Sequence, residues 1–94
     1  ENKVLMAFRD VNPQAPTHIL IIPKKHIQSM HHATPEDELL LGQLMLAAKN
    51  IAIEEGLGEA GYRLVFNTHD EGGQTVHHMH LHLLGGRQMT WPPG

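Results

Sequence analysis

Residues 74–86 read QTVHHMHLHLLGG, and this stretch sets most of our expectations for the chain. From position 78 to 82 every second residue is histidine, and large apolar residues fill the gaps. Side chains alternate between the two faces of a strand, so the pattern predicts a strand over Val76–Leu84 with imidazoles on one face. The apolar face is expected to pack against a helix. The imidazoles belong to His78, His80 and His82, and the apolar face carries Met79, Leu81 and Leu83.

Size and charge restrict the classes of protein. The chain has 94 residues, a formal net charge of -3 and no cysteine. It is long enough for one domain, 1–94, and its charge gives no electrostatic reason to bind nucleic acid. Without cysteine there is no disulfide framework, thiolate zinc site or cysteine nucleophile. No stretch approaches the ~20 apolar residues of a membrane span. We therefore expect no membrane association and a cytoplasmic location, or a nuclear one in a eukaryote.

Three other segments are predicted to be strands. They are VLMAFR at Val4–Arg9, THILIIP at Thr17–Pro23 and YRLVFNT at Tyr62–Thr68. Polar, proline- or glycine-containing stretches separate them from their neighbours, as is typical of turns.

One helix is predicted between the second and third strands. Thr34 is suited to the cap and Pro35 to the first helical position. An apolar stripe then recurs at spacings of three and four residues over about 20 residues, until Gly56 ends the helix. Its members are Leu40, Leu44, Ala48 and Ile51. The resulting order, β-β-α-β-β, predicts an α+β fold with a mostly antiparallel sheet covered by the helix on one face.

The residues alone leave three interpretations of the histidine strand. It is an ordinary amphipathic strand, a metal site or a site of covalent catalysis. A metal site would take two of the three imidazoles together with His18, His69 or Asp70, although no cysteine pair or HExxH helix accompanies them. Covalent catalysis would use a neutral imidazole as nucleophile. The preceding loop, Gly72–Thr75, favours catalysis because its backbone N–H groups can cradle a phosphate.

The residues around the histidine strand resemble those of a known family. HMHLHLL at 78–84 fits the histidine-triad pattern His-φ-His-φ-His-φ-φ, where φ is hydrophobic. The flanking segments are also similar to the Hint branch, the histidine triad nucleotide-binding proteins. These segments are DVNPQAPTH at 10–18, ILIIPKKH at 19–26, GYR at 61–63, GGQ at 72–74, GGRQM at 85–89 and WPPG at 91–94.

The resemblance implies a HIT-like fold of about four to five strands, in which two subunits join their sheets in a homodimer. It implies a purine nucleoside phosphoramidase, or nucleotidyl hydrolase, that needs no metal or other cofactor and binds an AMP-type purine nucleotide. The alternative function is a nucleotide-binding regulatory or scaffold module with little turnover.

The resemblance also assigns residues to roles. His80 would attack the α-phosphorus, His82 would hydrogen-bond the phosphate oxygens, and His78 would orient His80 through its carbonyl. His18 matches an additional histidine behind the triad, and Thr75 stands near the leaving group. The nucleotide-binding residues would be Phe8, Asp10, Val11, Asn67, Gly73, Gln74 and Thr75, and Trp91 would reach the site from the partner subunit.

Three features depart from the family pattern. The helical segment that precedes the first strand in the family is not found in these residues. His77 stands where tyrosine is usual, and Thr75 stands where serine is common. We expect these changes to affect base selectivity and the range of leaving groups.

Overall fold

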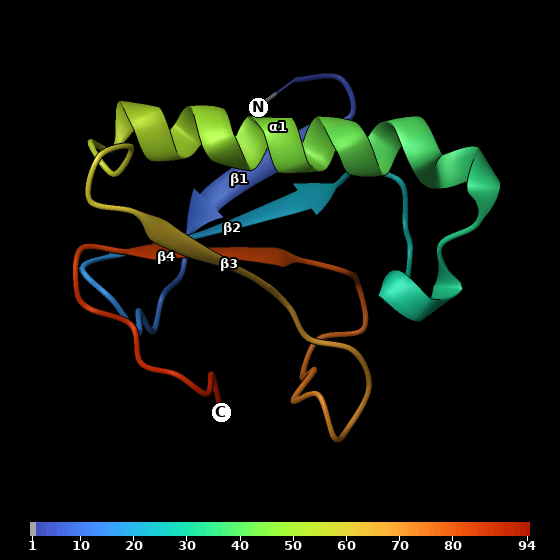
Figure 1. The fold of residues 1–94 in the computed structure, drawn as a ribbon. Coiled ribbons are helices and arrows are strands. Elements are labelled where there is room, and N and C mark those ends of the chain that lie inside the picture. Colours follow the sequence, from blue (N-terminus) through green and yellow to red (C-terminus); the bar gives the residue numbers. More distant parts are fainter. Residues whose placement is uncertain (1) are drawn as a thin grey trace.

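The computed structural model describes residues 2–94 and shows one antiparallel sheet with one long helix across one face (Figure 1). The four strands lie in the order β1-β2-β4-β3. They are β1 Leu5–Arg9, β2 Thr17–Pro23, β3 Tyr62–Phe66 and β4 Leu81–Gly85. The α+β class, the antiparallel sheet and the single main helix are confirmed. The C-terminal tail lies on the side of the sheet away from the helix.

The helix begins as the sequence predicted. A 3-10 turn, Pro35–Asp37, leads directly into α1, Glu38–Glu54. The backbone N–H of Thr34 donates to Asp37 Oδ2 at 2.9 Å, so the Asp37 side chain closes the first turn. Lys25, two residues after the end of β2, donates to the other carboxylate oxygen at 2.5 Å. This hydrogen bond is the main cause that lowers the pKa of Asp37, and it links the start of the helix to the sheet.

The core lies between α1 and the sheet. Leu44, Ala48 and Ala52 on the helix are fully buried, and they face Leu81 and Leu83 of β4. The predicted alternation is confirmed over residues 78–84, because Met79, Leu81 and Leu83 are buried while their neighbours are half-buried. The central position of β4 in the sheet therefore places its other face, which carries His82, at the middle of the open side.

The predicted start of the last strand, Val76, was wrong. β4 begins only at Leu81, so His78 and His80 precede the strand, although the ring of His80 still lies beside that of His82, with centroids 5.0 Å apart. The register pairs Leu81 with Ile21, and β2 ends two residues later at Pro23, which has no N–H to donate to a continued ladder. Residues 76–80 therefore bend away, and Met79 N–H donates instead to the carbonyl of Ile27 in the loop after β2.

No helix in the described residues is long and apolar enough to cross a membrane.

Candidate active site

His80 is held by the backbone of the segment that precedes β4. Its Nδ1 lies 2.8 Å from the carbonyl oxygen of His78. A carbonyl only accepts hydrogen bonds, so Nδ1 must carry the proton. The neutral ring then has a free lone pair on Nε2, which is the form that a nucleophile requires. The bend at residues 78–80 that shortens β4 thus also fixes the tautomer of His80.

The ring of His78 is fixed in turn by the end of β2. Its Nε2–H donates to the carbonyl of Pro23 at 2.7 Å, and its Nδ1 accepts from the backbone N–H of Ile27 at 3.4 Å. His26 stacks on the same ring, with centroids 5.1 Å apart. Both nitrogens of His78 are therefore occupied by backbone partners, so this side chain anchors the segment and does not face a ligand.

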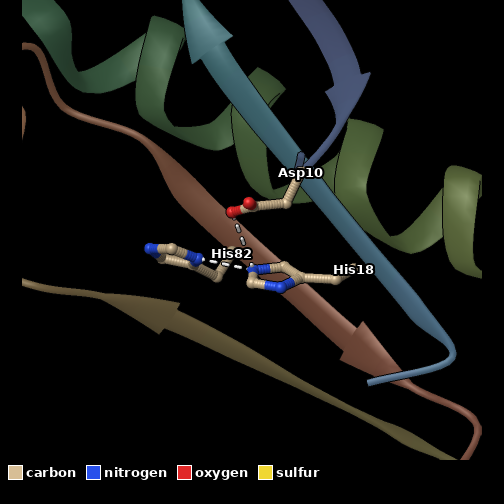
Figure 2. A group of neighbouring side chains, drawn as sticks. All are labelled: Asp10, His18 and His82. Carbon is tan, nitrogen blue, oxygen red and sulfur yellow. Dashed lines mark hydrogen bonds and ion pairs between the residues drawn. The ribbon is translucent and has the colours of Figure 1, made fainter. Parts of the chain in front are cut away.

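A second chain of hydrogen bonds fixes His82 (Figure 2). The backbone N–H of Gln14 donates to Nδ1 of His18 at 3.0 Å, so the proton of the neutral His18 ring is on Nε2. That atom lies 2.9 Å from His82 Nδ1, which must accept. The proton of His82 is then on Nε2. One backbone amide in the turn before β2 thus determines the tautomers of two histidines on neighbouring strands.

Asp10 approaches the same pair from the end of β1 (Figure 2). Its Oδ2 lies 3.5 Å from His18 Nε2, and its Oδ1 accepts from the backbone N–H of Asn12 at 2.8 Å. Asp10 therefore closes its turn and also places a negative charge beside the two imidazoles.

Asp10, His18 and His82 are close enough to be considered as metal ligands. One ligand atom from each lies within 4.8 Å of the others. The hydrogen bonds argue against this use, however. His18 would have to bind the metal through Nε2, and Nε2 carries the proton because Gln14 N–H occupies the lone pair of Nδ1. We therefore interpret the group as a hydrogen-bonded chain.

His82 presents an unpaired donor to the open face of the sheet. Its Nε2 is buried and has no hydrogen-bond partner among the described residues. His82 lines a cavity of about 460 Å³ together with His18, Asn67 and Arg63. Burial lowers the pKa of His82 below its ordinary value of 6.5, and charge on His80 or His18 lowers it further, whereas Asp10 raises it. His82 is thus expected to act as a neutral hydrogen-bond donor.

This assignment predicts the protonation of His82 and its effect on stability. At pH 7, nitrogen-15 spectra of the ring should show the neutral tautomer protonated on Nε2. Because the folded pKa is depressed, the unfolded chain takes up a proton first as the pH falls below about 6.5, so the free energy of unfolding decreases there. The loss should be smaller in His82→Asn. A doubly protonated His82 at pH 7 would contradict the assignment.

The loop between β3 and β4 is built around Gln74. This side chain is buried; its Oε1 accepts from His69 N–H, and its Nε2 donates to the carbonyls of Gln28 and Val76. Gln74 therefore shapes the loop, and both of its amide atoms are engaged within the protein. A Cβ on Gly72 would lie 2.3 Å from the Thr68 carbonyl oxygen, so the tight turn requires glycine there. Gly73, with a φ of 80°, and Thr75 are exposed.

Three other predicted residues, Phe8, Val11 and Trp91, do not line the cavity beside His82. Phe8 and Val11 are exposed apolar side chains at the end of β1, and Val11 is 100% exposed. Trp91 in the C-terminal tail is 82% exposed. The structure thus brings together His18, His82 and Asp10, with Asn67 in the same cavity and His80 beside His82. It leaves Trp91 without packing in this chain. Sequence reasoning missed Gln14, Pro23 and Ile27, which act through backbone atoms and carry no side-chain signal.

Comparison with known proteins adds to this description. The model of the HIT domain family matches residues 1–89. An uncharacterized HIT-like protein of Synechococcus elongatus is 58% identical over the whole chain, which covers 82% of that protein. Among solved structures, a HIT family hydrolase from Legionella pneumophila is 61% identical with a TM-score of 0.99, and the match covers 100% of this chain and 84% of that one. A histidine triad nucleotide-binding protein from Candida albicans is 30% identical, with a TM-score of 0.80, and the match covers 98% of this chain and 71% of that one.

Proposed function

Because the chain belongs to the HIT domain family, we propose that it hydrolyses purine nucleoside phosphoramidates through a covalent intermediate on His80. One observation carries the proposal: the His78 carbonyl at 2.8 Å holds the proton of His80 on Nδ1 and leaves Nε2 free. The relatives supply the reaction class and the ligand class. One of them is described as a HIT family hydrolase and another as a nucleotide-binding protein.

The reaction proceeds in two displacements at phosphorus. His80 Nε2 first forms a bond to the α-phosphorus while the bond from phosphorus to the leaving amine breaks, and the amine departs after taking up a proton from solvent. Water then attacks the same phosphorus, breaks its bond to Nε2, gives a proton back to solvent and releases the nucleoside monophosphate. The His78 carbonyl stabilises the positive charge that develops on the ring in the first step, and this division replaces one difficult displacement by two easier ones.

Two groups are suited to hold the phosphate. The buried Nε2–H of His82 has no partner in the described structure, so donating to a phosphate oxygen would satisfy it. The exposed backbone at Gly73 can add N–H donors, and the Thr75 hydroxyl would lie near the leaving amine. Donors fixed before the reaction typically contribute several kcal/mol to the stabilisation of transition-state charge.

The nucleoside would lie along the end of β1. Asp10 would bind the ribose hydroxyls, and Phe8 and Val11 would cover the base, which accounts for their exposure. Asn67 would approach the sugar and phosphate from the cavity that it shares with His82. We further propose that two copies join into a homodimer, so that the exposed Trp91 of one subunit reaches the site of the other.

Turnover of adenosine 5'-phosphoramidate in the presence of a chelator tests this function. We expect AMP and ammonia to be released at an undiminished rate, because every proposed role belongs to a side chain or backbone group of this chain. Loss of activity on chelation, with recovery on adding metal, would contradict the proposal. Tight binding of AMP without turnover of any phosphoramidate would instead support the alternative, a nucleotide-binding regulatory module.

A further inference from the structure

Three imidazoles outside the proposed active site gather where two loops meet. His31 and His32 belong to the loop after β2, in the 3-10 turn Met30–His32, and His69 begins the glycine-containing loop after β3. All three side chains are exposed. Their ring centroids are separated by 5.3 Å (His31–His69), 5.6 Å (His32–His69) and 6.0 Å (His31–His32).

These separations are close to those of imidazoles around one metal ion. With a metal–nitrogen distance of about 2.0–2.1 Å and tetrahedral angles, ring centroids lie about 5 Å apart. The three pairs meet edge to face, a geometry that neutral rings favour, whereas protonated rings would repel one another.

A buried serine beneath the cluster orients two of the rings. Ser29 is fully buried, and its Oγ lies 2.7 Å from Nδ1 of His32 and 3.4 Å from Nε2 of His69. Metal-binding histidines typically hydrogen-bond a second group through the nitrogen that does not bind the metal, which fixes the tautomer. If both rings donate to Ser29, a lone pair remains on His32 Nε2 and on His69 Nδ1. His31 has no such constraint among the hydrogen bonds of the described residues.

We propose that His31, His32 and His69 form a surface site for a divalent transition-metal ion of the zinc class, separate from the catalytic histidines. Imidazole nitrogen is a preferred ligand for such ions, and water completes the coordination. The ring nitrogens of His31, His32 and His69 do not yet lie close enough to share one ion. In the described part of the chain, only Asp10, His18 and His82 bring three ligand atoms within 4.8 Å. Metal binding therefore requires the exposed rings to rotate on backbones that already place them together.

Such an ion would link the glycine-containing loop after β3, which is proposed to bind the phosphate, to the loop after β2. The two loops already share the hydrogen bond from Gln74 Nε2 to the Gln28 carbonyl, and His69 N–H donates to the same Gln74 side chain. A metal bridge across His32 and His69 would add a second connection, so binding should raise the melting temperature.

Titration of the metal-free protein with zinc chloride tests the site. We expect one equivalent to bind saturably and to raise the melting temperature. Either His32→Asn or His69→Asn should weaken binding by at least about tenfold. His77→Asn is the matched control, because His77 is also exposed and lies in the same loop as His69, where it borders the same surface pocket, but the ring contacts of the cluster join only His31, His32 and His69. This control should bind zinc as the unaltered protein does.

Two outcomes would overturn the inference. One is the absence of saturable zinc binding by the folded protein. The other is zinc binding that survives replacement of His31, His32 and His69 but is lost in His18→Asn, which would place the ion at Asp10, His18 and His82. Both outcomes are independent of the proposed phosphoramidase activity, because they are read from zinc binding and from the melting temperature in the absence of nucleotide.

Discussion

His80→Ala is expected to reduce phosphoramidate turnover by a factor on the order of 10⁴ or more, because it removes the atom that bonds to phosphorus. Binding of AMP should change little, since the groups proposed to hold the phosphate, ribose and base belong to other residues. Steady-state turnover of adenosine 5'-phosphoramidate and calorimetric titration with AMP measure the two effects separately.

His31→Ala is the control for this experiment. It removes an exposed imidazole from a different loop and should keep full turnover without added metal. Turnover by His80→Ala at the rate of the unaltered protein would show that another group attacks phosphorus. A parallel loss of AMP binding would mean that His80 chiefly holds the ligand.

Leu83→Ala is expected to be among the most destabilising single changes in the core. Leu83 is fully buried at the centre of β4, where it pairs with Ile19 of β2 and Leu64 of β3. Truncating a buried leucine typically lowers the free energy of unfolding by about 2–5 kcal/mol, against a total of about 5–15 kcal/mol for a domain. Urea unfolding followed by circular dichroism measures the loss.

Leu39→Ala makes the comparison specific to burial. Leu39 is 75% exposed on α1, and its truncation should change the free energy of unfolding by no more than about 0.5 kcal/mol. Equal losses in the two variants would indicate that Leu39 is covered in solution, for example by a second copy of the chain. A negligible loss for Leu83→Ala would contradict the position of β4 in the core.

The sequence predicted the parts of the fold that depend on local patterns. The bounds of β2 agree with the apolar run that Pro23 ends, and the helix follows from Thr34, Pro35 and the stripe through Leu44. The alternation of Met79, Leu81 and Leu83 correctly identified the buried face. Each of these features is encoded by residues within a single helix or strand.

The features that the sequence did not predict depend on partners distant in the chain. β4 starts late because β2 ends at Pro23 and the chain then hydrogen-bonds to Ile27, which no pattern within 76–84 reveals. The tautomer of His82 is set by the Gln14 amide through His18, and a backbone N–H has no sequence signature. The resemblance identified the histidines, but only the three-dimensional structure gives the hydrogen-bond partners from which their tautomers are inferred.

The most direct test is mass spectrometry of protein quenched in alkali during turnover, since alkali preserves bonds between phosphorus and imidazole. We predict that one nucleotidyl group will be found on the peptide that contains His80, and that fragmentation will place it on that ring. A nucleotidyl group on His78 or His82, or product formation without any covalent adduct, would contradict attack by His80 Nε2.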